Sequence, residues 1–157
     1  MRDILLVGLA SGPKVIERLL RVFPADRLDE RPNPDKFTVR ETIAHLADYE
    51  QFILDRFRMA KSRPGTQVEA YDPDERCASH HFGDKEVFHE AEVFESRRAT
   101  TIEFVRELSD AELNNTFKFS DGREISAIDY VSVILAHDLS HLDSVSSYLA
   151  TEVATHI

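Results

Sequence analysis

Apolar residues recur at steps of three and four along four stretches of the chain, which is the spacing of the buried face of an amphipathic helix. The stretches cover residues 4–23, 38–61, 84–108 and 126–150. No long stretch alternates between apolar and polar residues as a half-buried strand would. The pattern therefore predicts an all-α protein built as a four-helix bundle.

The starts of the second and third helices carry capping signals. Thr38 and Glu41 form a capping box, in which each side chain bonds a backbone N–H that the helix leaves free. Asp84 is predicted to cap the third helix. Within the first helix, Gly12-Pro13 predicts either a kink or a restart of the helix, and the sequence leaves both outcomes open.

Two connectors are long enough to have structure of their own. Residues 62–83 lack clear periodicity, and the aromatic residues among them favour a loop packed over one end of the bundle. Residues 116–123 alternate in hydrophobicity around Asp121-Gly122, which predicts a small hairpin before the last helix. Ser126 then opens that helix.

The last predicted helix is apolar on more than one face. A helix in a monomeric bundle needs about one apolar stripe. The surplus predicts that this helix also packs against a second subunit, as in a homodimer. The residues of the second arc are Val131, Leu135, Leu139, Leu142 and Leu149.

The composition limits the classes of function. A chain of 157 residues with 42% hydrophobic content is the size of one domain, predicted to span residues 1–157. The net charge of -10 argues against nucleic acid and anionic membranes as partners. No apolar run approaches the roughly 18 to 20 residues of a membrane span. The acidic residues are interpreted as solvated helix faces.

Cysteine usage bears on the compartment. Cys77 is the single cysteine and cannot form an internal disulfide, which is typical of a reducing, cytoplasmic location. With no second reactive group beside it, Cys77 is interpreted as an inert thiol. The adjacent pair His80-His81 is interpreted as loop surface. The sequence assigns no role to either.

Two histidines four residues apart, His137 and His141, lie in the last predicted helix. This spacing places both imidazoles on one helix face, one turn apart, where they can bind one ion. Two nitrogens rarely hold a metal firmly, so a third donor is needed. His45 fits, because it lies beside the apolar stripe of the second helix and faces the interior.

A bare pair of histidines at this spacing is more often a packed or surface pair than a metal site. The position of His45 on another amphipathic helix makes the metal site the favoured interpretation. Neutral imidazoles suit several divalent metals, of which zinc or nickel is expected first. Two carboxylates, Asp48 and Asp138, are candidates for orienting an imidazole or a water, and are the candidate catalytic residues.

Two segments together resemble the DinB-like (YfiT-like) superfamily. They are residues 31–50, RPNPDKFTVRETIAHLADYE, and residues 136–142, AHDLSHL. The resemblance implies a four-helix bundle of up-down-down-up order, often dimeric, with a divalent metal held by His45, His137 and His141. The chain departs from the family at Phe37, where many members carry tryptophan, and at Ser140, where an aromatic or histidine-rich neighbourhood is common.

The same resemblance implies thiol chemistry. Family members with assigned activities include S-transferases that use bacillithiol or mycothiol and a maleylpyruvate isomerase, alongside metal-dependent hydrolases. We therefore expect a thiol-dependent S-transferase that acts on small electrophiles. The alternatives are a hydrolase that uses a metal-bound hydroxide and a bundle that binds a ligand without catalysis.

Overall fold

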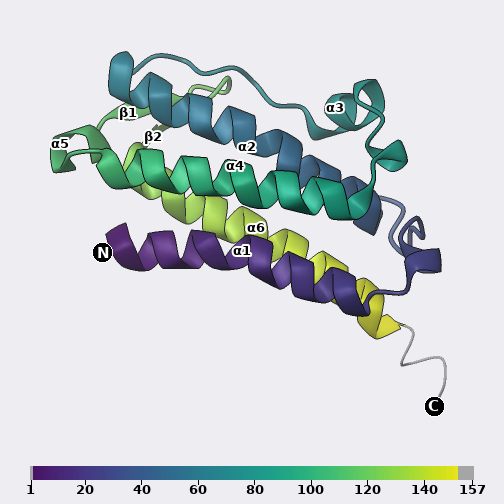
Figure 1. Ribbon diagram of the computed structural model, residues 1–157. Coiled ribbons are helices and arrows are strands. Elements are labelled where there is room, and N and C mark those ends of the chain that lie inside the picture. Colours follow the sequence, from purple (N-terminus) through teal and green to yellow (C-terminus); the bar gives the residue numbers. More distant parts are fainter. Residues whose placement is uncertain (1, 152–157) are drawn as a thin grey trace.

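Four long helices form the bundle in the computed structural model, which describes residues 2–151 (Figure 1). Helices α1 and α6 run in one direction, and α2 and α4 run in the other (Figure 1). The predicted four-helix bundle of up-down-down-up order is therefore confirmed. The four helices are α1 Arg2–Val22, α2 Val39–Ser62, α4 Val87–Glu107 and α6 Ala127–Thr151.

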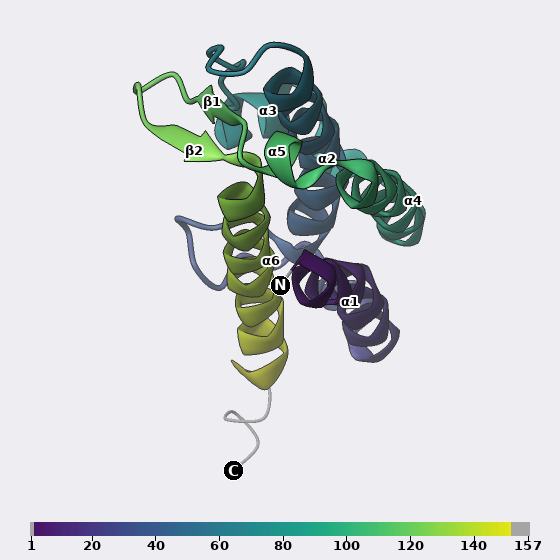
Figure 2. The same ribbon diagram turned by 90° about the vertical axis from the view of Figure 1, so that its left-hand side faces the viewer.

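The predicted hairpin before the last helix is confirmed. Its two short strands pair antiparallel, with Phe117 opposite Ile125, and Gly122 takes a positive φ of 85° in the turn. The hairpin lies at the end of the bundle where α6 begins (Figure 2). The short elements of the chain are η1 Ala25–Arg27, α3 Pro73–Ser79, η2 Phe82–Asp84, α5 Asp110–Leu113, β1 Thr116–Lys118 and β2 Glu124–Ser126.

The predicted cap of the third long helix is wrong by two residues. Asp84 ends the short helix η2, and Glu86 caps α4 instead. The Glu86 carboxylate accepts the backbone N–H groups of Phe88 at 3.1 Å and His89 at 2.6 Å. The predicted capping box of Thr38 and Glu41 at the start of α2 is present.

The connector between α2 and α4 contains a helix that the periodicity did not predict. Asp72 caps α3 by accepting the N–H groups of Asp74 and Glu75, and Pro73 occupies the first turn. Because α2 and α4 are parallel, the connector runs back along α2 before α4 starts (Figure 1). The order of the bundle thus lays this segment beside α2.

Helix α1 passes through Gly12 and Pro13 without interruption. Pro13 has no N–H to donate to the carbonyl of Leu9, four residues earlier. Arg98 of α4 takes its place, since its Nη1 lies 3.2 Å from that carbonyl oxygen. A Cβ at position 12 would lie 2.9 Å from the Asp138 carboxylate, so glycine leaves room for the polar groups beside α1.

Arg98 is 1% exposed and joins α4 to the other three long helices. Its guanidinium donates to Glu50 Oε1 of α2 at 2.6 and 2.9 Å, and to the two oxygens of Asp138 on α6 at 2.5 and 3.2 Å. Thr101 donates to the other oxygen of Glu50 at 3.1 Å. The interpretation of the acidic residues as solvated faces is therefore wrong for Glu50, which is 1% exposed.

This polar layer divides the apolar core into two clusters. One cluster lies toward the start of α1 and includes Leu9, Phe57 and Ile134. The other lies toward the end of α1 and includes Ile16 and Ile43, among others. Each long helix contributes residues to both clusters, so all four are held at both ends of the bundle.

Most of the second apolar arc of α6 packs within the chain, mainly through contact with α1. Leu135 lies against Gly8 of α1, where an added Cβ would be 3.0 Å from its Cδ2. Leu142 is partly buried against the core. Leu139 and Val133 remain exposed, at 66% and 45%. Within residues 2–151, no helix is both long enough and apolar enough to span a membrane.

Replacement of Arg98 by methionine is expected to destabilise the fold strongly. The change leaves the carboxylates of Glu50 and Asp138 buried without a cation, which costs about 3–5 kcal/mol. Urea denaturation measures the loss in the free energy of unfolding. Arg106→Met, an exposed position on the same helix, should stay within about 0.5 kcal/mol of the parent. A loss below 1 kcal/mol for Arg98→Met would contradict the assigned role.

Homodimerisation through α6 stays a prediction. Light scattering should give a molar mass of twice the 18.0 kDa of one chain. Leu139→Lys should shift it to one chain by placing a charge in the apolar contact. Val22→Lys, an exposed apolar position on α1, should leave the dimer intact. A parent protein that is monomeric at micromolar concentration would rule the interface out.

Candidate metal centre

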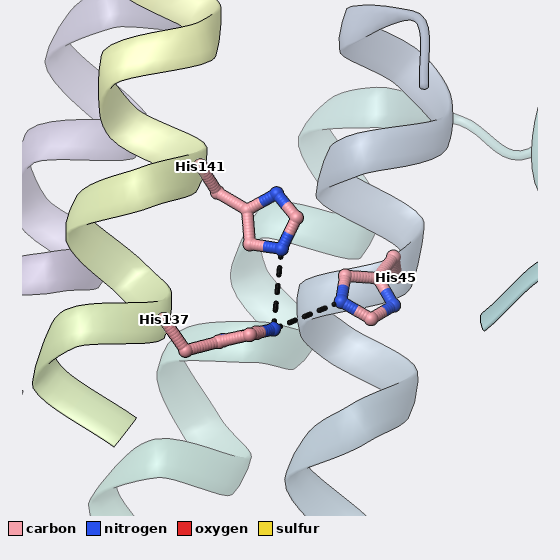
Figure 3. Close-up of side chains that lie close together, drawn as sticks. All are labelled: His45, His137 and His141. Carbon is pink, nitrogen blue, oxygen red and sulfur yellow. Dashed lines mark hydrogen bonds between the residues drawn. The ribbon is translucent and has the colours of Figure 1, made fainter. Parts of the chain in front are cut away.

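Three imidazoles converge between α2 and α6. The Nε2 atom of His137 lies 3.1 Å from Nε2 of His45 and 3.1 Å from Nε2 of His141. Figure 3 shows the three rings pointing toward one another, His45 from α2 and the other two from consecutive turns of α6. One ligand atom from each residue falls within a span of 4.8 Å. The structure thus brings the three predicted histidines together.

The helix geometry explains why the rings meet. The spacing of His137 and His141 stacks them on one face of α6. Helices α2 and α6 contact each other much less extensively than the other neighbouring pairs of long helices. The imidazoles lie in the space that remains between them.

The donor set fits a divalent metal ion. Two imidazole nitrogens bound to a tetrahedral zinc ion at about 2.0–2.1 Å lie roughly 3.3 Å apart, close to the two separations of 3.1 Å. Burial and the neighbouring His141 and His137 lower the pKa of His45 to about 2. Burial, followed by the charge of His137, lowers the pKa of His141 to about 4. These two rings are therefore neutral at pH 7 and have a lone pair to donate.

The predicted carboxylates stand behind the imidazoles rather than in contact with the space between them. Asp48 pairs with Arg76, at 2.9 Å from Nε and 2.5 Å from Nη2, and accepts the Tyr71 hydroxyl at 3.1 Å. Asp138 pairs with Arg98, and its Oδ1 lies 3.6 Å from Nδ1 of His137. That separation is too long for a hydrogen bond, and the buried Nδ1 has no other partner within the described chain.

A cleft of about 730 Å³ opens over the imidazoles. The three histidines and Tyr49 line its floor. Its walls come from three separate segments of the chain. This volume is within the range of pockets that bind cofactors and small molecules. The wall residues are Arg31, Pro34, Asp35, Lys36 and Phe37 before α2, Thr42 on α2, Tyr71, Pro73 and Asp74 before and in α3, and Ser140 and Ser144 on α6.

Aromatic side chains that the sequence did not single out surround the site. Tyr49 stacks on His45, with ring centres 5.8 Å apart and planes 12° apart. Its hydroxyl accepts a hydrogen bond from the buried Arg56, which also donates to Tyr130 at 2.8 Å. The four-residue step from His45 to Tyr49 was a signal for the first contact. The contact of Arg56 with Tyr130 depends on packing between α2 and α6.

Tyr71 was likewise missed as a neighbour of the site. Its hydroxyl oxygen lies 3.0 Å from Nδ1 of His45. Burial, and then the charge of Asp48, raises the pKa of Tyr71 well above its ordinary value. Tyr71 belongs to the connector between α2 and α4, where no periodic pattern indicates which side chain turns inward.

The other candidates lie apart from the three imidazoles. His80 and His81 are exposed, as predicted. Cys77 is half-buried on α3, and burial, followed by the charge of Glu41, raises the pKa of its thiol. A raised pKa disfavours the reactive thiolate, which agrees with the interpretation of an inert thiol.

Two solved structures show the same fold. YfiT from Bacillus subtilis, described as a probable metal-dependent hydrolase with an unusual four-helix bundle topology, matches with a TM-score of 0.90 and 16% identity over 96% of this chain and 87% of its own. A mycothiol-dependent maleylpyruvate isomerase matches with a TM-score of 0.73 and 17% identity over 90% of this chain. The match covers 59% of the isomerase, so this chain spans less than two thirds of that protein.

The sequence itself identifies the family. No curated protein matches the chain. The family model of the DinB superfamily matches residues 9–145, which include the three histidines and parts of all four long helices. The chain therefore belongs to the DinB superfamily.

Proposed function

We propose that the protein is a divalent-metal-dependent enzyme that transfers small electrophiles to a low-molecular-weight thiol. The observation that carries the proposal is the convergence of three imidazole nitrogens at the floor of an open cleft. Zinc or nickel is the expected ion. Bound there, such an ion would hold the cofactor thiol as the thiolate at neutral pH.

The residues of the chain bind and orient the reactants. His45, His137 and His141 would hold the ion at the inner end of the cleft. The ion would supply the cofactor thiol as a thiolate, whose sulfur would bond to the electrophilic carbon as the leaving group departs with its electron pair; the thiol proton would pass to solvent. A cleft of about 730 Å³ has room for a thiol and a small electrophile together.

The placement of the carboxylates favours a thiol over water as the nucleophile. Attack by water is helped by a base beside the metal, as in the glutamate of metalloproteases. The carboxylates in the cleft lining, Asp35 and Asp74, belong to connector segments at its walls. Asp48 and Asp138 are each paired with an arginine, and we propose that they orient imidazoles rather than act as bases.

Mycothiol or bacillithiol is the proposed class of thiol. The similarity to a mycothiol-dependent isomerase supports this choice. The proposed reaction belongs in the cytoplasm, where thiols stay reduced. The similarity to YfiT supports a second candidate, a hydrolase of small esters or amides that uses a metal-bound hydroxide.

Metal analysis and a transfer assay test the proposal together. Protein from unsupplemented cells should contain about one divalent metal ion per chain, because three histidine ligands hold an ion firmly whereas two hold it weakly. It should also accelerate the reaction of monochlorobimane with at least one low-molecular-weight thiol. His137→Ala should abolish both properties, and His89→Ala, an exposed histidine on α4, should change neither.

A metal content near zero in the parent, unchanged in His137→Ala, would contradict the metal site. Rates equal to the uncatalysed background for every thiol would contradict the transferase. Turnover of esters that needs no thiol and stops with a chelator would favour the hydrolase instead.

The stability of the metal-free protein should depend on pH through His141. Its pKa is about 4 in the folded chain and about 6.5 in an unfolded one. Between these values the unfolded chain takes up a proton that the folded chain does not, so the free energy of unfolding should fall as the pH falls from 6.5 toward 4. Urea denaturation with a chelator measures this slope, which should be shallower in His141→Gln. Equal slopes in both proteins would refute the assignment.

A further inference from the structure

The connector between α2 and α4 reaches the metal centre through one side chain. Tyr71 packs its ring against Tyr49 and Phe52 of α2, with ring centres 4.6 and 4.8 Å away. Its hydroxyl oxygen lies between Nδ1 of His45, at 3.0 Å, and Oδ2 of Asp48, at 3.1 Å. A residue outside the four long helices thus touches the back of an imidazole whose front faces the other two histidines.

The hydrogen-bonding capacity of these groups fixes the direction of each bond. An ionised carboxylate only accepts hydrogen bonds. The single hydrogen of the Tyr71 hydroxyl is therefore donated to Asp48, and the hydroxyl oxygen is left as an acceptor. His45 must then carry its hydrogen on Nδ1, which leaves the lone pair of Nε2 directed at His137 and His141.

Arg76 of α3 fixes the orientation of the Asp48 carboxylate. It binds both carboxylate oxygens, at 2.5 and 2.9 Å, in a bidentate geometry. Its guanidinium also lies 5.3 Å from the centre of the Phe52 ring. Arg76 and Tyr71 flank Asp48, and both come from the same connector.

We propose that Tyr71 is a positioning residue for the metal centre: held by Asp48 and Arg76, its hydroxyl oxygen keeps the hydrogen of His45 on Nδ1 and so presents Nε2 to the ion. In many metal sites a carboxylate orients a ligating histidine directly. Here the carboxylate acts through a phenol from another segment. The proposal rests on the metal site of the proposed function and does not depend on the thiol chemistry.

Metal binding and docking of the connector are therefore linked. An ion on Nε2 makes the Nδ1 hydrogen of His45 a stronger donor to Tyr71. By reciprocity, a docked connector raises the affinity of the site for the ion by the same factor. The segment that forms one wall of the cleft, with Tyr71, Pro73 and Asp74, therefore docks more tightly on α2 when the ion is bound.

Tyr71→Phe tests the proposal, because it removes the hydroxyl and keeps the ring. Nitrogen-15 NMR of the metal-free protein at pH 7.5 should show a protonated Nδ1 and a bare Nε2 for His45. In Tyr71→Phe this preference should be lost, and the dissociation constant for cobalt(II) should rise about 10- to 100-fold, the usual effect of removing such a partner. The cobalt absorption spectrum should change with it.

Tyr148→Phe is the matched control. It removes a hydroxyl that donates to the carbonyl of Phe37 at 3.2 Å and should change neither the tautomer of His45 nor the cobalt affinity. Asp48→Asn should weaken cobalt binding in the parent but add little to Tyr71→Phe, because Asp48 acts through the phenol.

A hydrogen on Nε2 of His45 in the metal-free parent would overturn the proposal, even if Tyr71→Phe failed to fold. Unchanged cobalt affinity and spectrum in a folded Tyr71→Phe protein would overturn it as well. If the parent itself bound no metal, the proposed function would fail. The tautomer of His45 in the parent and in Tyr71→Phe would still decide the role of Tyr71.

Discussion

The buried guanidinium of Arg98 sets the relative position of the elements on which the candidate site depends. It lies on α4, yet it binds Glu50 of α2 and Asp138 of α6. Glu50 is five residues from His45, and Asp138 is next to His137. Helices α2 and α6 contact each other little, and Arg98 of a third helix binds a carboxylate on each of them close to the imidazoles.

A charged layer of this kind contributes more to the choice of one arrangement than to stability. A buried ion pair is often no more stabilising than apolar residues of the same volume. It does penalise every register in which a carboxylate would remain unpaired, which an apolar core alone does not do. The two apolar clusters on either side of the layer supply the burial, and the layer selects the alignment in which the histidines meet.

The sequence predicted the parts of the structure that depend on local or periodic signals. The four helices, the capping box and the face shared by the histidines of α6 follow from spacing alone, and His45 follows from its position on an amphipathic helix. The buried role of Arg98 was not predicted, because a charged residue that pairs with residues of other helices has the same local sequence pattern as a solvated one. The contact of Tyr71 with the site was not predicted, because a connector has no periodic pattern that indicates which of its side chains face inward. The cap at Glu86 was not predicted because Asp84, two residues earlier, is also a good capping residue. Helix α3 was not predicted because the Asp72-Pro73 signal was not interpreted as a helix start.

The parallel arrangement of α2 and α4 has a bearing on how such a protein can diversify. After α2, whose 24 residues span about 36 Å, the chain must return the whole length of the helix before α4 can begin. That obligatory return forms one wall of the cleft from a surface segment, and surface segments accept substitutions and insertions more readily than packed helices. Apart from Tyr71 and Arg76, this wall can be remodelled for new ligands while the helices keep the imidazoles in place. The topology thus separates the part of the site that must stay constant from the part that is free to evolve.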